Sequence, residues 1–261
     1  MNIRLVKNGG DVNNSSDCFD LPSNFSFDND ALDRDYKAEN RIFQDGGKVQ
    51  GFGVIGSKEK TVSGRYLTKP AGKTVDQWSS ELLSFCIYNE PLRLYIMNNN
   101  IDGLWFYSGV YLKDRPRKPI VFAYQDEIEM TFIIENPYRK SESLVTETFS
   151  GISNNSTFSM NIAGLFRVSP VLTITAKATN SAFSIINTSD NYLSLDVSYP
   201  NFLANDIMIA DCENSTLIKN SISLKNYMNS DFIKLVPGAN VLKYTGQADI
   251  DLAITYRNLR A

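Results

Sequence analysis

The strongest constraint on the fold is an alternation of apolar and polar residues with a period of two. It is clearest in Leu193–Tyr199 and recurs in Ile250–Tyr256 and Leu172–Ala176. Such a period places one set of side chains on each face of a β-sheet. Nine further stretches have strand composition: Thr61–Leu67, Leu92–Met97, Leu104–Leu112, Ile120–Tyr124, Glu129–Glu135, Phe183–Asn187, Ile207–Ala210, Ile222–Leu224 and Val241–Tyr244. Many short strands separated by turn residues predict sandwiches or barrels.

One segment predicts a helix instead. Thr74 and Gln77 have the spacing of a capping box. The apolar residues that follow recur at the spacing of one helical face: Val75, Trp78, Leu82 and Phe85. The helix is expected to end before Pro91, because the residue before a proline is disfavoured in helical conformation. We expect Trp78 and Phe85 to anchor this helix on a sheet.

The absence of histidine limits the chemistry of the chain. It excludes the Ser-His-Asp and Cys-His arrangements of nucleophilic catalysis and the histidine-based zinc motifs. The 261 residues include 26 basic and 29 acidic side chains, so the net charge is −3 and the pI is about 5.2. A generally basic nucleic-acid binder is therefore excluded, because such a domain usually has a much higher pI.

Cysteine usage and hydropathy bear on the compartment. Cys18, Cys86 and Cys212 lie too far apart for a CxxC unit, and this sparse, odd count predicts free, mostly buried thiols in a reducing interior. No apolar run approaches the roughly 18 residues of a membrane span. The first ten residues, MNIRLVKNGG, lack the apolar core of a signal peptide. We therefore expect a soluble protein that stays in the cytoplasm or joins a particle assembled there.

Two acidic groups are candidates for a metal or catalytic site. One could form a calcium loop: Asp28, Asp30, Asp33 and Asp35. Its sixth position, which an EF-hand requires as glycine, is Asp33, so we interpret it as a solvated acidic loop. The other could supply the paired carboxylates of a glycosidase: Asp126, Glu127 and Glu129. Acidic residues between strands are usually surface turns, and Asp249 and Asp251 are expected on the wet face of the last strand. We assign no catalytic, metal or cofactor-binding residue and expect no cofactor.

Two other stretches leave alternatives open. Lys113–Pro119 is a basic loop that could contact phosphate or an acidic partner, although its prolines favour an ordinary hairpin connection. The strand that precedes it is aromatic, with Trp105, Phe106, Tyr107 and Tyr111. Because both of its faces are apolar, it is either buried on both sides or lies at a subunit contact.

Composition predicts two β-rich domains. The first spans residues 1–138 and the second spans residues 169–261, where a new alternating strand begins. Residues 139–168 between them are rich in serine, threonine and asparagine with little clean periodicity. They are interpreted as a linker or an irregular extension.

The C-terminal end carries a family resemblance. Within Ser230–Tyr244 a strand ends in a Pro-Gly-x-Asn turn, Pro237–Asn240. A hairpin then continues through Gly246 and ends in an aromatic-arginine pair in Asp251–Arg257, and Ser169–Ala176 has the composition of the strand that opens such a domain. These stretches resemble the distal tail proteins of long-tailed, siphovirus-type phages.

The N-terminal half agrees with the same resemblance. Gln44–Gly47 and Thr61–Leu67 resemble the early strands of the family. The predicted helix with Trp78 and Leu82, followed by Glu90–Tyr95, resembles its strand-helix-strand unit.

The resemblance implies a mainly β protein. It implies an N-terminal β-sandwich or split-barrel ring domain with one α-helix, and a C-terminal galectin-like β-sandwich. It further implies a structural protein without catalytic activity, located in the virion at the tail tip. Its partners would be further copies of itself in a homohexameric ring, the tail tube protein, the tail-tip hub protein, and receptor-binding or baseplate proteins on the outer sandwiches.

Elementary physics explains the recurring turn. Pro237 presets the turn, and Gly238 takes a conformation closed to bulkier residues. Asn240 is expected to bond to backbone within the turn. These positions should therefore hold the fold and should not form a binding site.

An alternative function is a carbohydrate-binding module that contacts the host surface, since galectin-like sandwiches can bind sugars. Three tyrosines are possible stacking platforms for a sugar: Tyr192, Tyr199 and Tyr227. A cell-wall-degrading glycosidase that uses Glu127 or Glu129 is a third hypothesis.

Overall fold

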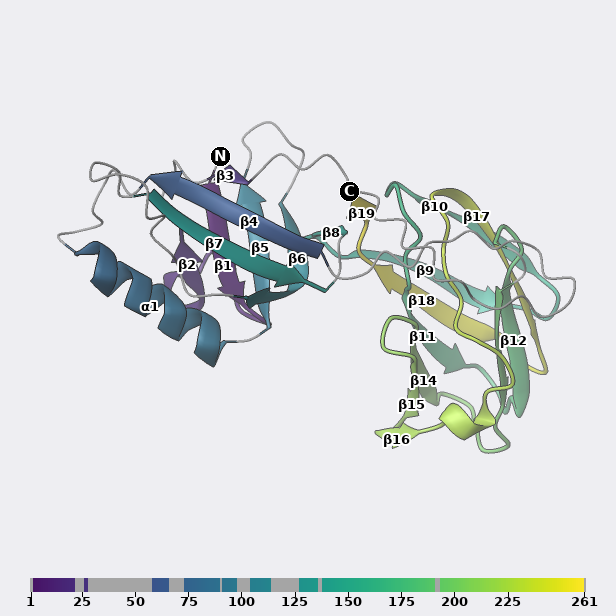
Figure 1. Ribbon diagram of the computed structural model, residues 1–261. Helices are drawn as coiled ribbons and strands as arrows, with labels where there is room; N and C mark the ends of the chain where they lie inside the picture. The colour runs from purple at the N-terminus through teal and green to yellow at the C-terminus, as the bar shows by residue number, and fades with distance from the viewer. Residues whose placement is uncertain are drawn as a thin grey trace, which may run out of the picture. The chain divides into compact units, whose positions relative to one another are not determined.

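The computed structural model divides into two compact units, Met1–Arg139 and Lys140–Arg260. The structure describes residues 2–21, 26–27, 58–65, 73–89, 91–97, 104–113, 127–135, 138–190 and 193–260. Each unit has its own hydrophobic core and is described by itself (Figure 1).

Unit 1 is built on an antiparallel sheet with the strand order β2-β1-β5-β6-β7-β4-β3. Its strands are β1 (Asn2–Lys7), β2 (Cys18–Asp20), β3 (Ser26–Phe27), β4 (Lys58–Arg65), β5 (Leu92–Met97), β6 (Trp105–Leu112) and β7 (Glu127–Ile134). A short 3₁₀ turn, η1 (Ser15–Asp17), precedes β2, and the helix α1 (Val75–Tyr88) lies between β4 and β5 in sequence. The predicted strand Ile120–Tyr124 lies outside the described residues.

Helix α1 begins with the predicted capping box. The backbone N–H of Gln77 donates to Thr74 Oγ1 over 3.2 Å, and the N–H of Thr74 donates to Gln77 Oε1 over 2.9 Å. Trp78 is only 3% exposed, and its ring centroid lies 5.8 Å from that of Phe19 on β2. Trp78 is therefore the expected core anchor, whereas Phe85 is only partly buried against the same core.

The second face of the sheet in unit 1 is also buried. A small cluster covers it, formed by Val6, Val12, Tyr95 and Phe106. The rings of Tyr95 and Phe106 stack with their centroids 5.2 Å apart. Trp105 and Phe106 are 8% and 4% exposed, and Tyr107, which joins the helix-side core, is 4% exposed. Of the two alternatives for the aromatic strand, burial on both sides within one chain is therefore confirmed for these three residues.

Unit 2 is a β-sandwich of two antiparallel sheets with the orders β10-β17-β12-β13 and β16-β15-β14-β11-β18-β9. Its strands are β9 (Val145–Ile152), β10 (Thr157–Ile162), β11 (Val171–Ala176), β12 (Ala182–Asn187), β13 (Leu193–Ser198), β14 (Ile207–Asp211), β15 (Thr216–Lys219), β16 (Ile222–Ser223), β17 (Gly238–Gly246) and β18 (Ile250–Tyr256). A 3₁₀ turn, η3 (Lys225–Tyr227), follows β16, and the short strands β8 (Arg139–Ser141) and β19 (Leu259–Arg260) pair with each other.

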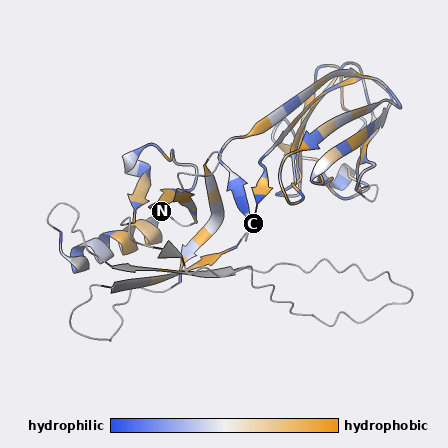
Figure 2. Ribbon diagram, turned by 90° about the horizontal axis from the view of Figure 1, so that it is seen from above, coloured by the Kyte–Doolittle hydropathy of each residue, from blue (hydrophilic) through white to orange (hydrophobic). Residues whose placement is uncertain are grey.

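The alternation of the sequence sets the inner and outer faces of this sandwich. In β18, Ile250, Leu252 and Ile254 are buried in the core, and the residues between them are half-buried on the outer face. β11 follows the same pattern. Figure 2 shows this alternation as bands of opposite hydropathy along the strands.

Residues 139–168 differ from the predicted linker or irregular extension. They contain β8, β9 and β10, and both β9 and β10 belong to unit 2. β9 pairs with β18, and β10 pairs with β17. The abundance of serine, threonine and asparagine reflects the outward faces of two edge strands, since Met160 and Ile162 point into the core.

The Pro-Gly-x-Asn turn has the predicted structural role. Gly238 has a φ of +84°, which disfavours any residue with a Cβ. Asn240 is fully buried, and its side chain bonds to the backbone of Val236 and Gly238. It also accepts a hydrogen bond of 3.0 Å from the amide of Asn187 on β12, which ties the turn to the neighbouring strand.

Candidate functional site

Several sequence-predicted site residues lie outside the described residues. They are Asp28, Asp30, Asp33, Asp35, Asp126, residues 114–119 of the basic loop, and Tyr192. Glu127 and Glu129 lie on β7, but their side chains are outside the described part, as is any geometry of a carboxylate pair there. In the ranges that are described, no group of three or more cysteine or carboxylate side chains is arranged to hold a metal ion.

Two of the three candidate tyrosines come together in unit 2. The rings of Tyr199, just after β13, and Tyr227, in η3, meet edge to face with centroids 4.9 Å apart. The Lys219 ammonium lies 5.3 Å from the centroid of the Tyr199 ring. Tyr199 is half-buried against the core, whereas Tyr227 is 41% exposed. Tyr227 is therefore the ring of this pair that offers a stacking surface.

The lysine in this cluster is fixed by two oxygen partners. Lys219 Nζ lies 2.5 Å from Asp206 Oδ2 and donates to the carbonyl oxygen of Asn201 over 2.6 Å. The Asp206 carboxylate also accepts the Leu203 N–H over 2.7 Å. The hydrogen bond from Lys219, followed by that of the Leu203 N–H, lowers the pKa of Asp206 below its ordinary value. Among the described residues of this cluster, the Asp206 carboxylate is held as an anion by Lys219, which does not suit it to acid–base catalysis.

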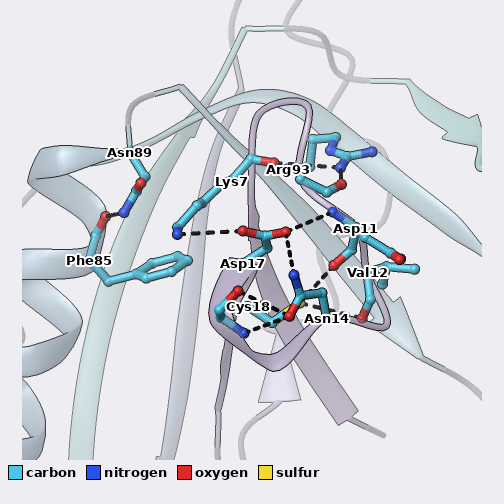
Figure 3. Close-up of polar contacts among 11 residues, drawn as sticks. Lys7, Asp11, Val12, Asn14, Asp17, Cys18, Phe85, Asn89 and Arg93 are labelled. Atoms are coloured by element: carbon cyan, nitrogen blue, oxygen red, sulfur yellow. Dashed lines mark hydrogen bonds and ion pairs between the residues drawn. The ribbon is translucent and has the colours of Figure 1, made fainter.

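The loop between β1 and β2 is a second polar cluster, which the sequence did not predict. Figure 3 shows Asp17 at its centre, accepting from the Lys7 ammonium, the Asp11 N–H and the Asn14 amide over 3.1–3.5 Å. The Arg93 guanidinium on β5 donates to carbonyl oxygens of the same loop. These bonds hold an exposed, polar loop against β1 and β5.

Exposed apolar residues mark further contact surfaces. In unit 1, Ile87 and Tyr88 at the end of α1 are 59% and 83% exposed. In unit 2, Ile207 and Ile209 of β14 point outward from the six-stranded sheet. Adjacent exposed apolar side chains are typical of protein interaction sites.

In the described part of the chain, neither the cysteine thiols nor the hydropathy of the helix indicates a reactive site or a membrane-spanning segment. All three cysteines are free, and burial raises the pKa of the Cys212 thiol to about 12, which makes it inert. The described part of the chain contains no helix long and apolar enough to cross a membrane.

Comparison with known proteins identifies the sandwich. A family model described as siphovirus-type tail component, C-terminal domain, matches residues 163–259. Over these residues the chain is similar to the C-terminal domain of siphovirus-type tail components. The matched range begins directly after β10 and ends in β19, so it includes most of unit 2. The sequence has no match among curated proteins.

Solved structures extend the likeness to the whole chain. The crystal structure of phage SPP1 Dit matches with a TM-score of 0.55 and 12% sequence identity, over 99% of both chains. A structure of the phage P2 baseplate in its activated conformation with Ca matches with a TM-score of 0.43 and 10% identity, over 98% of both chains. The match to SPP1 Dit shows a shared fold. The predicted mainly β fold class is thus confirmed, and the predicted resemblance is confirmed by the family model over residues 163–259.

Proposed function

We propose that the chain is a distal tail protein that forms a homohexameric ring joining the tail tube to the tail-tip hub. Its sandwiches would support receptor-binding or baseplate proteins, and it would reach the tail tip of the virion after assembly in the host cytoplasm. The observation that carries the proposal is the family match of residues 163–259. The fold shared with SPP1 Dit, which is described as a paradigm of a hub adsorption apparatus, supports it.

The ring contact must use residues other than the aromatic strand. Trp105, Phe106 and Tyr107 are already buried within one chain, so they offer little area to a neighbour. We propose that Ile87 and Tyr88 lie in this contact, because they are the most exposed apolar side chains among the described residues of unit 1. A head-to-tail contact that repeats the same two patches closes into a ring when its rotation closes.

Light scattering of the full chain tests this assembly. A hexamer of 29.3 kDa chains has a mass of about 176 kDa. We expect this mass either for the chain alone or only after the tail tube protein is added. Tyr88→Lys is expected to shift the mass toward the monomer. Ser84→Lys, at another exposed position of the same helix, should leave the mass unchanged. A chain that stays monomeric with the tube protein, or a twofold dimer, would overturn the proposal.

A second candidate function is saccharide binding at Tyr227. It is favoured by the exposed ring of Tyr227 beside Tyr199 and Lys219, because sugars stack on aromatic faces and bond to charged neighbours. Binding of the full chain to a glycan array would support it if Tyr227→Ala abolished the signal and Tyr88→Ala did not. Binding to tail proteins without any glycan signal would contradict it.

We propose, finally, that the chain has no catalytic activity. The absence of histidine and the structural role of the matched family support this. Purified protein should release no product from peptidoglycan or capsule, and release that Glu127→Gln or Glu129→Gln abolishes would revive the glycosidase hypothesis.

A further inference from the structure

Strand β9 forms one edge of the six-stranded sheet in unit 2. It pairs with β18 on one side through the register from Tyr256↔Val145 to Leu252↔Phe149. Among the described residues, no strand, turn or side chain bonds its other side. Because an antiparallel strand directs alternate backbone groups to each side, a row of N–H and C=O groups on β9 faces away from β18. Such a row can pair with a further strand.

The other edges of the sandwich are shorter or already occupied. Beside β13, Met228 forms a bridge to Val197, and the Asn229 N–H donates to the Asp196 carbonyl over 2.9 Å. β16 has only two residues. β10 has six, and its Asn161 carbonyl accepts the Tyr256 hydroxyl. β9, with eight residues, is therefore the longest edge of unit 2.

A β-bulge at Gly151 limits the length over which β9 is a regular strand. Gly151 has a φ of +61° and donates its N–H to Asp251 Oδ1 over 2.9 Å. The pairing with β18 shifts by one residue here, which is a β-bulge. A bulge turns the strand out of line, so an added strand can run regularly along residues 145–150.

The side chains of β9 restrict which strand can pair with it. Val145, Glu147 and Phe149 lie opposite core residues of β18, so they share the inner face of the sheet. Burial, followed by the charge of Glu147, raises the pKa of Tyr256, which places this carboxylate beside the core. Glu147 already shares a hydrogen bond with Tyr256, but an apolar strand would bury its charge without supplying an opposite charge, which prevents indiscriminate pairing.

We propose that β9 is the docking edge for an extended strand of a separate tail protein that carries Lys or Arg opposite Glu147. The same strand places aliphatic residues opposite Val145 and Phe149, and small polar residues on the outer face beside Thr146 and Thr148. Opposite charges on directly opposed residues stabilise a strand pair, and like charges destabilise it. That the partner belongs to the tail rests on the proposed function, whereas the pairing itself does not.

Two capped synthetic peptides test the pairing on the full chain. One is Thr-Val-Thr-Lys-Thr-Val-Thr, and the other has Glu in place of Lys. Amide hydrogen exchange of residues 145–150 is measured by mass spectrometry at millimolar peptide. At a Lys-peptide concentration about ten times its Kd, exchange there should slow about tenfold, because only the unoccupied fraction exchanges. The Glu peptide should bind about tenfold more weakly.

A charge swap provides the control. Glu147→Lys should reverse the preference, so that the Glu peptide protects β9 and the Lys peptide does not. Asp231→Lys makes the same change of charge at an exposed position beside Ser230, which bonds to β13 at the edge of the other sheet, and should keep the original preference. Equal protection by both peptides, or none from either, would overturn the inference.

Light scattering of the same samples separates this inference from the proposed function. If the peptide protects residues 145–150 but no ring is detected, only the proposed function is contradicted. If a ring is detected but the peptide gives no protection, only the docking edge is contradicted. Protection of residues 145–150 that rises with protein concentration in the absence of peptide would show pairing between copies. That result would overturn the assignment to a separate protein.

Discussion

Asn240→Ala should destabilise unit 2 by about 3 kcal/mol. Asn240 is fully buried, and its side chain bonds to three backbone groups over 2.8–3.0 Å, namely the Val236 N–H, the Val236 carbonyl and the Gly238 carbonyl. Each bond of this kind contributes about 1 kcal/mol, and alanine leaves these three part-buried backbone groups without this partner. The Asn187 amide loses one partner but keeps the Lys234 carbonyl at 2.7 Å, so it adds little.

The assay can assign the loss to unit 2, because both tryptophans, Trp78 and Trp105, lie in unit 1. In a urea titration, tryptophan fluorescence should report an unchanged midpoint for unit 1. Far-UV circular dichroism should show a second transition moved to lower urea. Asn161→Ala, on an exposed position of β10, is the matched control and should change stability by less than about 0.5 kcal/mol.

A loss below about 1 kcal/mol for Asn240→Ala would refute the reasoning, since it would be smaller than the summed contribution of three hydrogen bonds to part-buried backbone groups. An equal shift of both transitions would instead refute the independence of the two units. A double-mutant cycle with Asn187→Ala should give a coupling of at least about 0.5 kcal/mol, because the two amides are in direct contact.

Three further predictions concern the core, the pH response and the thiols. Trp78→Ala should lower the free energy of unfolding of unit 1 by about 3–5 kcal/mol, because burial is lost and a cavity remains. Unfolding is followed by circular dichroism, since the variant lacks one of the two tryptophans, and a loss below about 1 kcal/mol would contradict the anchoring role of Trp78. Because Lys219 lowers the pKa of Asp206 below its ordinary 3.8, the carboxylate contributes stability above that value and loses it as the pH falls through its folded pKa. The stability difference between the wild type and Asp206→Asn should therefore be present at neutral pH and vanish in acid; a difference independent of pH would refute the ion pair. Iodoacetamide should alkylate the half-buried Cys18 well before the buried Cys212, as peptide mass spectrometry would show, and the reverse order would contradict the burial.

The domain organisation remains a prediction, and the structure sharpens its test. Because β9 and β10 are strands of unit 2, limited proteolysis should leave a C-terminal fragment that begins before Val145. A stable fragment beginning near residue 169 would favour the boundary drawn from composition instead.

The central strands of unit 2 and the helix were predictable because a local pattern specified them. In β18 and β11 the inner residues are buried and the outer ones are half-buried, so the period of two is visible in the sequence itself. The capping box of α1 is equally local. In β10 the alternation of Phe158, Met160 and Ile162 was present as well, and the abundance of polar outer residues concealed it.

The sequence by itself determined the β class, the single amphipathic helix, the turn at Gly238 and the absence of histidine chemistry, because each depends on residue type or on neighbours a few positions away. Only the tertiary structure decided which surfaces remain free. Whether Phe106 meets another subunit depends on Tyr95 and Val6, which are distant in sequence and cover it in the fold. In the same way, non-local pairing sets the strand order that brings Tyr199 to Tyr227 and leaves β9 at the end of its sheet among the described strands. A local pattern carries no information about which strand ends a sheet.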